Sequence, residues 1–211
     1  MNNLIIISII FFVQTTVKAN CNNDPANLIN SANCDFTTDV TGWNLSTGDS
    51  VVHDITDDFL GNAPGAAIVD AADLGSGFVY AGALNQCIEI TTDTTAKTTG
   101  FWVKGNTGGD AECIISVIFY EGDGTGNCNL ANRGSCTTSQ VISSASGWTN
   151  LTCNTPVLTG SVETVNFAMS CGNGFASAQV PAPGDFTVKF DNAYVVPLGN
   201  TPVELIEFSI E

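Results

Sequence analysis

The chain has 211 residues, and its 5 Lys and Arg against 21 Asp and Glu give a formal net charge of -16 at pH 7. Such a surface repels phosphate backbones and anionic lipid, so neither nucleic acid nor insertion into a membrane is expected. Only 12% of the residues are charged and 21 are glycine, a mix typical of secreted β proteins. The acidity itself has two interpretations, solubility outside the cell or a supply of carboxylates for calcium.

The N-terminal segment predicts export. Residues 4–13 read LIIISIIFFV, which is too short to span a bilayer, and small or aliphatic residues precede Ala19. We expect residues 1–19 to be a secretory signal peptide cut after Ala19. No later segment is long and apolar enough to span a membrane, so the mature chain is expected to be extracellular or on a bacterial cell surface.

The cysteines point to the same compartment. There are eight, none in a CxxC pair, so zinc and redox motifs are disfavoured and four disulfides are expected. Eight cysteines allow about 105 pairings. Two local pairs are predicted, Cys128 with Cys136 inside one polar loop, and Cys21 with Cys34 near the start of the mature chain.

Short apolar and alternating segments follow one another along the chain, with no helical periodicity after the signal peptide. Roughly ten strands at such regular spacing predict an all-β sandwich or barrel. The expected strand segments are residues 27–29, 34–36, 42–43, 50–55, 66–70, 84–90, 98–104, 113–120, 147–152, 164–171 and 185–196. Residues 121–140 are expected to be a long polar insertion that holds Cys128 and Cys136.

The segment from Thr98 to Tyr120 is the most apolar part of the mature chain. Two apolar runs flank the glycine-rich turn Gly105–Asp110, and we expect them to form a hairpin in the middle of a sheet. In the first run Phe101 and Val103 share one face, so Trp102 and Lys104 share the other.

Several motifs resemble those of one family. They are Asn27-Leu28-Ile29, Cys34-Asp35-Phe36 with Gly42-Trp43, Leu84-Asn85-Gln86-Cys87-Ile88, Gly100-Phe101-Trp102-Val103-Lys104-Gly105, Gly147-Trp148-Thr149 and Lys189-Phe190-Asp191-Asn192-Ala193-Tyr194-Val195. In this order they resemble the jelly-roll carbohydrate-binding modules of the family 4, 9 and 22 group, which are galactose-binding-like β-sandwiches. The resemblance implies a two-sheet antiparallel sandwich over residues 20–196. Residues 197–211 are then a linker and a tail, which either adds one edge strand or leads into a further region.

The resemblance also implies a structural calcium near the chain ends. Its expected ligands are Asp191, Asp57 or Asp58, and Asp35 or the carbonyls near Cys34, because calcium takes six to eight oxygen ligands. The sequence departs from the family pattern at Thr37, where a carboxylate is often present. The alternative is that these aspartates cap turns in solvent.

Catalysis is not expected. The one histidine, His53, lies in a predicted strand, and no nucleophile motif accompanies it. Glu89, Glu112 and Glu121 lie near the central segment, where we expect solvated turns rather than a paired acid and base.

Sugar binding needs an aromatic platform and polar partners. If Trp102 faces outward, Tyr120 on the neighbouring strand shares its face, and Gln86, Asn85 and Tyr80 are candidate partners. The alternative is that Trp102 fills the core. The sequence therefore predicts a secreted, non-catalytic module that binds carbohydrate or a cell-surface glycan and holds a structural calcium. The rival is a structural or adhesive extracellular module without sugar affinity, which contacts other domains or assembly partners.

Overall fold

The computed structural model describes residues 21, 25–29, 32–59, 61, 65–71, 79–90, 94–107, 110–122, 126–143, 145–173 and 186–198. The predicted signal peptide and residues 199–211 of the tail lie outside these ranges. No helix within them is long and apolar enough to cross a membrane. The strands are β1 (Asn44–Thr47), β2 (Ser50–Asp54), β3 (Ala66–Ala71), β4 (Val79–Glu89), β5 (Lys97–Thr107), β6 (Ala111–Glu121), β7 (Asn132–Ile142), β8 (Thr149–Asn154), β9 (Val162–Asn173) and β10 (Phe186–Pro197).

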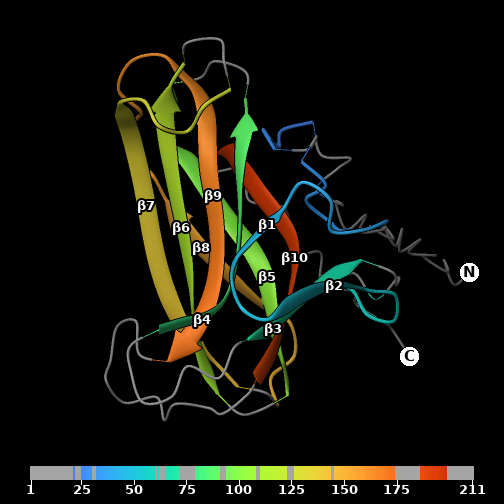
Figure 1. Ribbon diagram of the computed structural model, residues 1–211. Coiled ribbons are helices and arrows are strands. Elements are labelled where there is room, and N and C mark those ends of the chain that lie inside the picture. Colours follow the sequence, from blue (N-terminus) through green and yellow to red (C-terminus); the bar gives the residue numbers. More distant parts are fainter. Residues whose placement is uncertain are drawn as a thin grey trace, which may run out of the picture.

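The ten strands form two layers (Figure 1). Sheet A has the order β1-β4-β9-β6-β7 and sheet B the order β2-β3-β10-β5-β8. All paired strands are antiparallel. The predicted two-sheet antiparallel β-sandwich is therefore confirmed.

The core lies between the sheets and follows from the period of two in each strand. On β9 of sheet A, Phe167 and Met169 are fully buried, and on β5 and β10 of sheet B so are Phe101 and Phe190. The Phe101 and Phe190 rings meet edge to face at 5.6 Å, a favoured geometry for aromatic pairs. The inward residues of both sheets thus make one hydrophobic core.

The predicted central hairpin is wrong, although both of its apolar runs are strands. β5 pairs with β10 and β8 in sheet B, whereas β6 pairs with β9 and β7 in sheet A. The chain is therefore in sheet B at Thr107 and in sheet A at Ala111. Each run is apolar because it lies inside its own sheet, with Val103 facing the core from one side and Val117 from the other.

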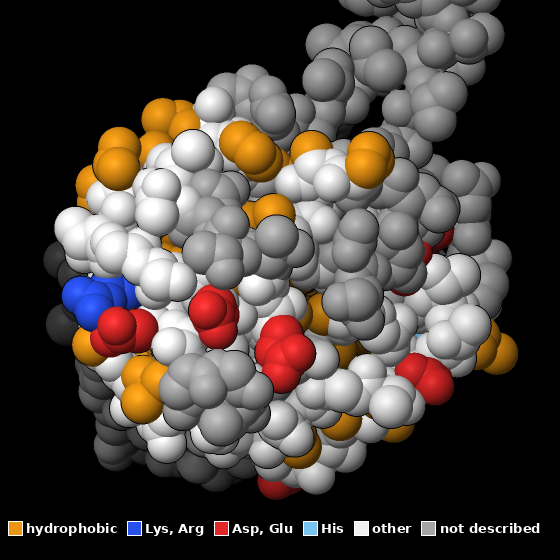
Figure 2. All heavy atoms as spheres, turned by 90° about the horizontal axis from the view of Figure 1, so that it is seen from above, with side chains coloured by type: hydrophobic (Ala, Val, Ile, Leu, Met, Phe, Trp, Pro, Cys, Tyr) orange, Lys and Arg blue, Asp and Glu red, His pale blue; other side chains and the backbone are white. Residues whose placement is uncertain are grey.

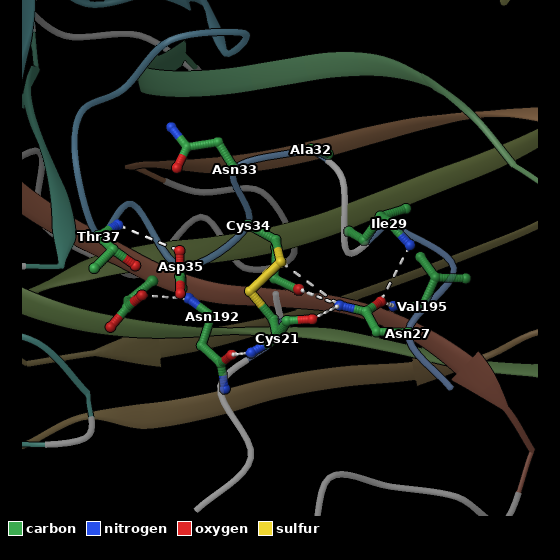
Figure 3. The surroundings of a disulfide bond; sticks show 12 residues. Cys21, Asn27, Ile29, Ala32, Asn33, Cys34, Asp35, Thr37, Asn192 and Val195 are labelled. Carbon is green, nitrogen blue, oxygen red and sulfur yellow. Dashed lines mark hydrogen bonds between the residues drawn. A yellow bond between two sulfur atoms is a disulfide. The ribbon is translucent and has the colours of Figure 1, made fainter. Parts of the chain in front are cut away.

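Four other predicted segments differ in the structure. Residues 27–29, 34–36 and 42–43 form turns or irregular backbone rather than strands. There the buried Asn27 amide joins the N-terminal segment to β10: its Nδ2 donates to the carbonyls of Cys21 and Ala193, and its Oδ1 accepts from Val195 N (Figure 3). Much of the predicted polar insertion is strand β7, in which Ser135, Thr137 and Ser139 point outward, whereas Cys136 and Ile142 are buried on the inward side.

All eight cysteines form disulfides, as predicted. The Cys21–Cys34 pair is confirmed and appears in Figure 3. The Cys128–Cys136 pair is wrong, because Cys136 faces inward on β7 and joins Cys153 of β8 in the opposite sheet. The remaining bonds are Cys87–Cys128 and Cys113–Cys171.

Gly100 on β5 leaves room for a buried tyrosine. A Cβ at this position would collide with the Tyr194 hydroxyl and stand 2.9 Å from the Leu151 carbonyl oxygen. Gly100→Ala is therefore expected to lower the free energy of unfolding by about 1–3 kcal/mol, measured by chemical denaturation. Gly147→Ala is the matched control, because no atom lies within 4 Å of its Cβ position. Equal stabilities of the two variants would contradict this account.

Candidate functional site

The outer face of sheet A carries small and polar side chains. On the central strand β9 this face shows Thr164, Asn166, Ala168 and Ser170, which alternate with the inward residues Val165, Phe167 and Met169. Residues that lie directly opposite each other on antiparallel strands point to the same face of the sheet. The outward residues of neighbouring strands therefore form rows across the sheet. One row is Asn85, Ala168, Ser116 and Thr137, and the next is Ala83, Ser170, Ile114 and Ser139.

A hollow of about 260 Å³ lies over these two rows. Its lining comes from β1, β4, β6 and β9, and comprises Ser46, Thr47, Ala83, Ile114, Ser116, Ala168 and Ser170. All but Ile114 are Ala, Ser or Thr, so the hollow exists because these side chains are short. Its chemistry is that of hydroxyl groups beside small apolar patches.

Two of the predicted ligand residues share this face. Asn85 is half-buried and lies opposite Ala168, beside the hollow. Tyr120 is half-buried farther along β6, opposite Thr164. The backbone of Tyr80 belongs to β4, but its side chain lies outside the described part of the structure.

Gln86 lies on the other side of β4, between the buried Leu84 and Ile88 in the alternation. Its Nε2 is 2.9 Å from the place that a Cβ on Gly42 would occupy. Its Oε1 is buried and accepts no hydrogen bond. The amide therefore packs under the sheet edge and cannot reach a ligand in the hollow.

Trp102 does not share a face with Tyr120, so the predicted aromatic platform is wrong. Trp102 is on the outer face of sheet B, where Phe59 stacks on it with ring centroids 3.7 Å apart and planes inclined by 17°. This contact leaves the indole 7% exposed. Trp102 therefore neither fills the core between the sheets nor offers a free ring to a ligand.

Three of the predicted calcium ligands are buried near the chain ends. Asp191, Asp35 and Asp58 are 2%, 6% and 8% exposed. Asp191 Oδ2 accepts a hydrogen bond from Phe59 N at 2.8 Å, and Asp35 Oδ1 accepts one from Thr37 N at 3.2 Å. Burial raises the pKa of Asp191 well above its usual value, and the negative charges of Asp58 and Asp35 raise it further. The three carboxyl groups therefore act on one another electrostatically.

Asp57 has different partners. Its Oδ2 lies 2.8 Å from Lys104 Nζ and 2.9 Å from Lys189 Nζ, and its Oδ1 accepts a hydrogen bond from Trp148 Nε1. Burial raises the Asp57 pKa, but the two lysines outweigh this effect and hold it below the usual value. Two ammonium groups at one carboxylate disfavour a divalent cation there.

The groups considered for catalysis are scattered. His53 is half-buried in β2, and its Nε2 has no hydrogen-bond partner. Glu112 is buried at 3% exposure and accepts a hydrogen bond from Ser139 Oγ at 2.7 Å, so the expected solvated turn is wrong for this residue. Across the strands Glu112 faces Val141 and Gly172 and not a second carboxylate.

The sequence matches no protein-family profile. Comparison with curated proteins gave no match. Among solved structures, the carbohydrate-binding module TmCBM61 in complex with β-1,4-galactotriose is 15% identical with a TM-score of 0.50, over 81% of this chain and 98% of that chain. An arabinose-bound GH51 α-L-arabinofuranosidase gives 14% identity and a TM-score of 0.50, over 78% of this chain and 26% of that chain. The likeness shows a shared fold, that of jelly-roll carbohydrate-binding modules, as the sequence motifs implied.

Proposed function

We propose that this chain is a secreted, non-catalytic module that binds carbohydrate on the outer face of sheet A. The observation that carries the proposal is the hollow of about 260 Å³ at the middle of that face. Its serine and threonine hydroxyls and the neighbouring Asn85 amide are the groups that hydrogen-bond to sugar hydroxyls. The likeness in fold to a module solved with β-1,4-galactotriose supports the same reading.

The alanine and isoleucine side chains of the hollow supply an apolar surface for the C–H groups of a sugar ring. Tyr120 lies farther along β6, opposite Thr164, and does not line the hollow. Because the lining side chains are short, a ligand would lie close to the sheet backbone. Four disulfides support secretion, since such bonds persist in oxidising compartments.

One observation favours the rival function, a structural or adhesive module. Among the described side chains of this face, Tyr120 is the only aromatic one. A glycan array on the purified secreted protein separates the two functions. Binding to any glycan class supports the carbohydrate module, whereas a blank array in the presence of calcium leaves the structural module. Turnover of a bound glycan would contradict the non-catalytic reading.

We also propose a structural calcium at Asp191, beside the carboxylates of Asp58 and Asp35. The charges of Asp58 and Asp35 repel a negative charge on the buried Asp191, and a bound divalent cation would offset this repulsion. Among the described residues, no three side chains of metal-ligating type converge on one point. Backbone carbonyl oxygens would therefore complete the coordination, as they do in many calcium sites.

Calcium is expected to raise the melting temperature of the domain. At a calcium concentration of about 100 times the dissociation constant, the gain of about 2.7 kcal/mol corresponds to roughly 5–10 °C for a chain of this size. Differential scanning fluorimetry with calcium, magnesium and EDTA measures the shift. Asp191→Asn should abolish the response and Asp57→Asn should keep it. A melting temperature that is indifferent to calcium would overturn the proposed metal.

A further inference from the structure

The loop between β6 and β7 is tied across the outer face of sheet A. It joins two adjacent strands, yet its Cys128 is bonded to Cys87 on β4, and β9 and β6 lie between β4 and β7 in the sheet. Cys87 belongs to the outer face, because it alternates with the inward Ile88. The loop must therefore pass over the outer side of β9.

Two further contacts show where the loop backbone lies. The Thr164 hydroxyl on β9 donates to Asn127 O at 3.0 Å, and the Cys87 sulfur lies 3.3 Å from Gly126 O. Gly126 has a φ of +72°, and a Cβ there would collide with the Glu89 carboxylate. The positive φ favours glycine at this position, and the exposed Glu89 side chain on β4 reaches the loop there. We call residues 126–131, held by the Cys87–Cys128 disulfide, the loop wall.

The loop wall stands beside the hollow. Cys87 follows Asn85 by two residues on β4, and the opposite residue Asn166 precedes Ala168 by two residues on β9. Residues two apart on one face of a strand are about 7 Å apart. The hollow itself is lined from β1 to β6, so it extends across the strands and parallel to the loop wall.

The charge at this end of the sandwich is negative. Glu89 is exposed on β4, Glu163 is half-buried at the start of β9, and acidic side chains are prominent when the molecule is seen from above (Figure 2). With a net charge of -16 for the whole chain, an anionic glycan would be repelled.

We infer that the loop wall is the specificity determinant of the carbohydrate site: it selects a neutral, linear glycan lying across the strands and excludes chains with branches on the wall side. This inference rests on the proposed function. The physical reason is steric, because a branch that points towards the loop wall would meet backbone atoms that the disulfide and the Thr164 hydrogen bond hold in place. Specificity then comes from rejecting the branched chain rather than from extra contacts with the linear one.

The test compares the affinities for linear and branched oligosaccharides that share the same sugar backbone. The probes are cellohexaose with a xyloglucan heptasaccharide, and xylohexaose with an arabinose-substituted xylo-oligosaccharide, titrated by isothermal calorimetry. For whichever backbone binds, the wild-type protein should prefer the linear probe at least about tenfold. The variant Cys87→Ser with Cys128→Ser should reduce this preference to about threefold or less, through a gain in affinity for the branched probe.

A second variant and a control distinguish a change in the loop wall from a general loss of folding. Thr164→Val removes only the hydrogen bond to Asn127 O and should lower the preference in the same direction. Cys136→Ser with Cys153→Ser removes a disulfide on the core side and should leave the preference unchanged. If the wild type binds but neither loop variant changes the preference, the inference is overturned while the proposed function stands. If the wild type binds none of the four probes, this inference is overturned, whereas the proposed function is overturned only by a blank glycan array.

Discussion

Ala168→Leu is expected to weaken glycan binding at least about tenfold, a loss of about 1.4 kcal/mol in binding free energy. Ala168 is at the middle of the central strand β9 and lines the hollow. It lies between Asn85 and Ser116 in one cross-strand row. A leucine side chain there would occupy the space that a sugar ring needs, and it offers no ring on which the sugar could stack. The measurement is calorimetric titration with a glycan that the array identifies.

Thr152→Leu is the matched control for this variant. Thr152 is exposed on β8, opposite Gly100, on the outer face of sheet B. The same leucine is therefore added on the opposite side of the molecule. Both variants should keep the wild-type melting temperature within a few degrees, because each new side chain points away from the core. If Ala168→Leu kept the wild-type affinity for the glycan, or if Thr152→Leu lost as much affinity, the glycan would not bind in the hollow.

Most of the strands could be predicted from the sequence, but β1, β7 and the pairing of the strands could not. Apolar runs at Phe101–Lys104 and Cys113–Tyr120 correctly predicted strands, because burial on the inner face requires apolar residues at alternate positions. Sequence proximity then suggested a hairpin. In the structure both runs are central strands of different sheets, and central position alone explains their apolarity. The local sequence pattern indicates that a strand is buried, but it does not indicate which strands lie beside it.

The candidate site was largely invisible for a related reason. Its lining consists of alanine, serine and threonine residues from four strands that are far apart in the sequence. Short side chains carry no chemical signature, whereas the tryptophan motif predicted a site at Trp102, which Phe59 covers. Only Asn85 and Tyr120 could be found from the motif and its alternation. Small residues at outward positions of neighbouring strands would have predicted the hollow. This pattern can be recognised only when the order of the strands in the sheet is known.

Sheet B carries a charge network on its outer face that holds the loop between β2 and β3. Lys189 Nζ on β10 lies 2.5 Å from Asp54 Oδ2 and 2.9 Å from Asp57 Oδ2. The side chains of Lys189 and Asp54 are only 9% and 4% exposed. Burial alone would raise the Asp54 pKa, but Lys189 and Thr56 outweigh it and hold the pKa below 3.8. Burial likewise disfavours charge on Lys189, yet the two aspartates raise its pKa above 10.5.

Lys189→Met is expected to lower the free energy of unfolding by about 3 kcal/mol, because it leaves the buried Asp54 carboxylate without its cation. For a chain of this size the melting temperature should fall by roughly 6–12 °C. The loss should be constant around neutral pH, where both partners are charged. It should shrink at acid pH, because protonation of Asp54 in the variant removes the charge that Lys189 compensates in the wild type. Thermal melts across this pH range measure both effects.

The comparison that isolates burial is Lys104→Met. Lys104 contacts the same Asp57 carboxylate at 2.8 Å, but the side chains of this pair are 31% and 24% exposed. Exposed pairs contribute about 1 kcal/mol or less, so this variant should melt close to the wild type. Combining Lys189→Met with Asp54→Leu should recover most of the lost stability, since no buried charge is then left without a partner. If the double variant were as unstable as Lys189→Met alone, the loss would come from packing of the lysine stem and not from the buried charge.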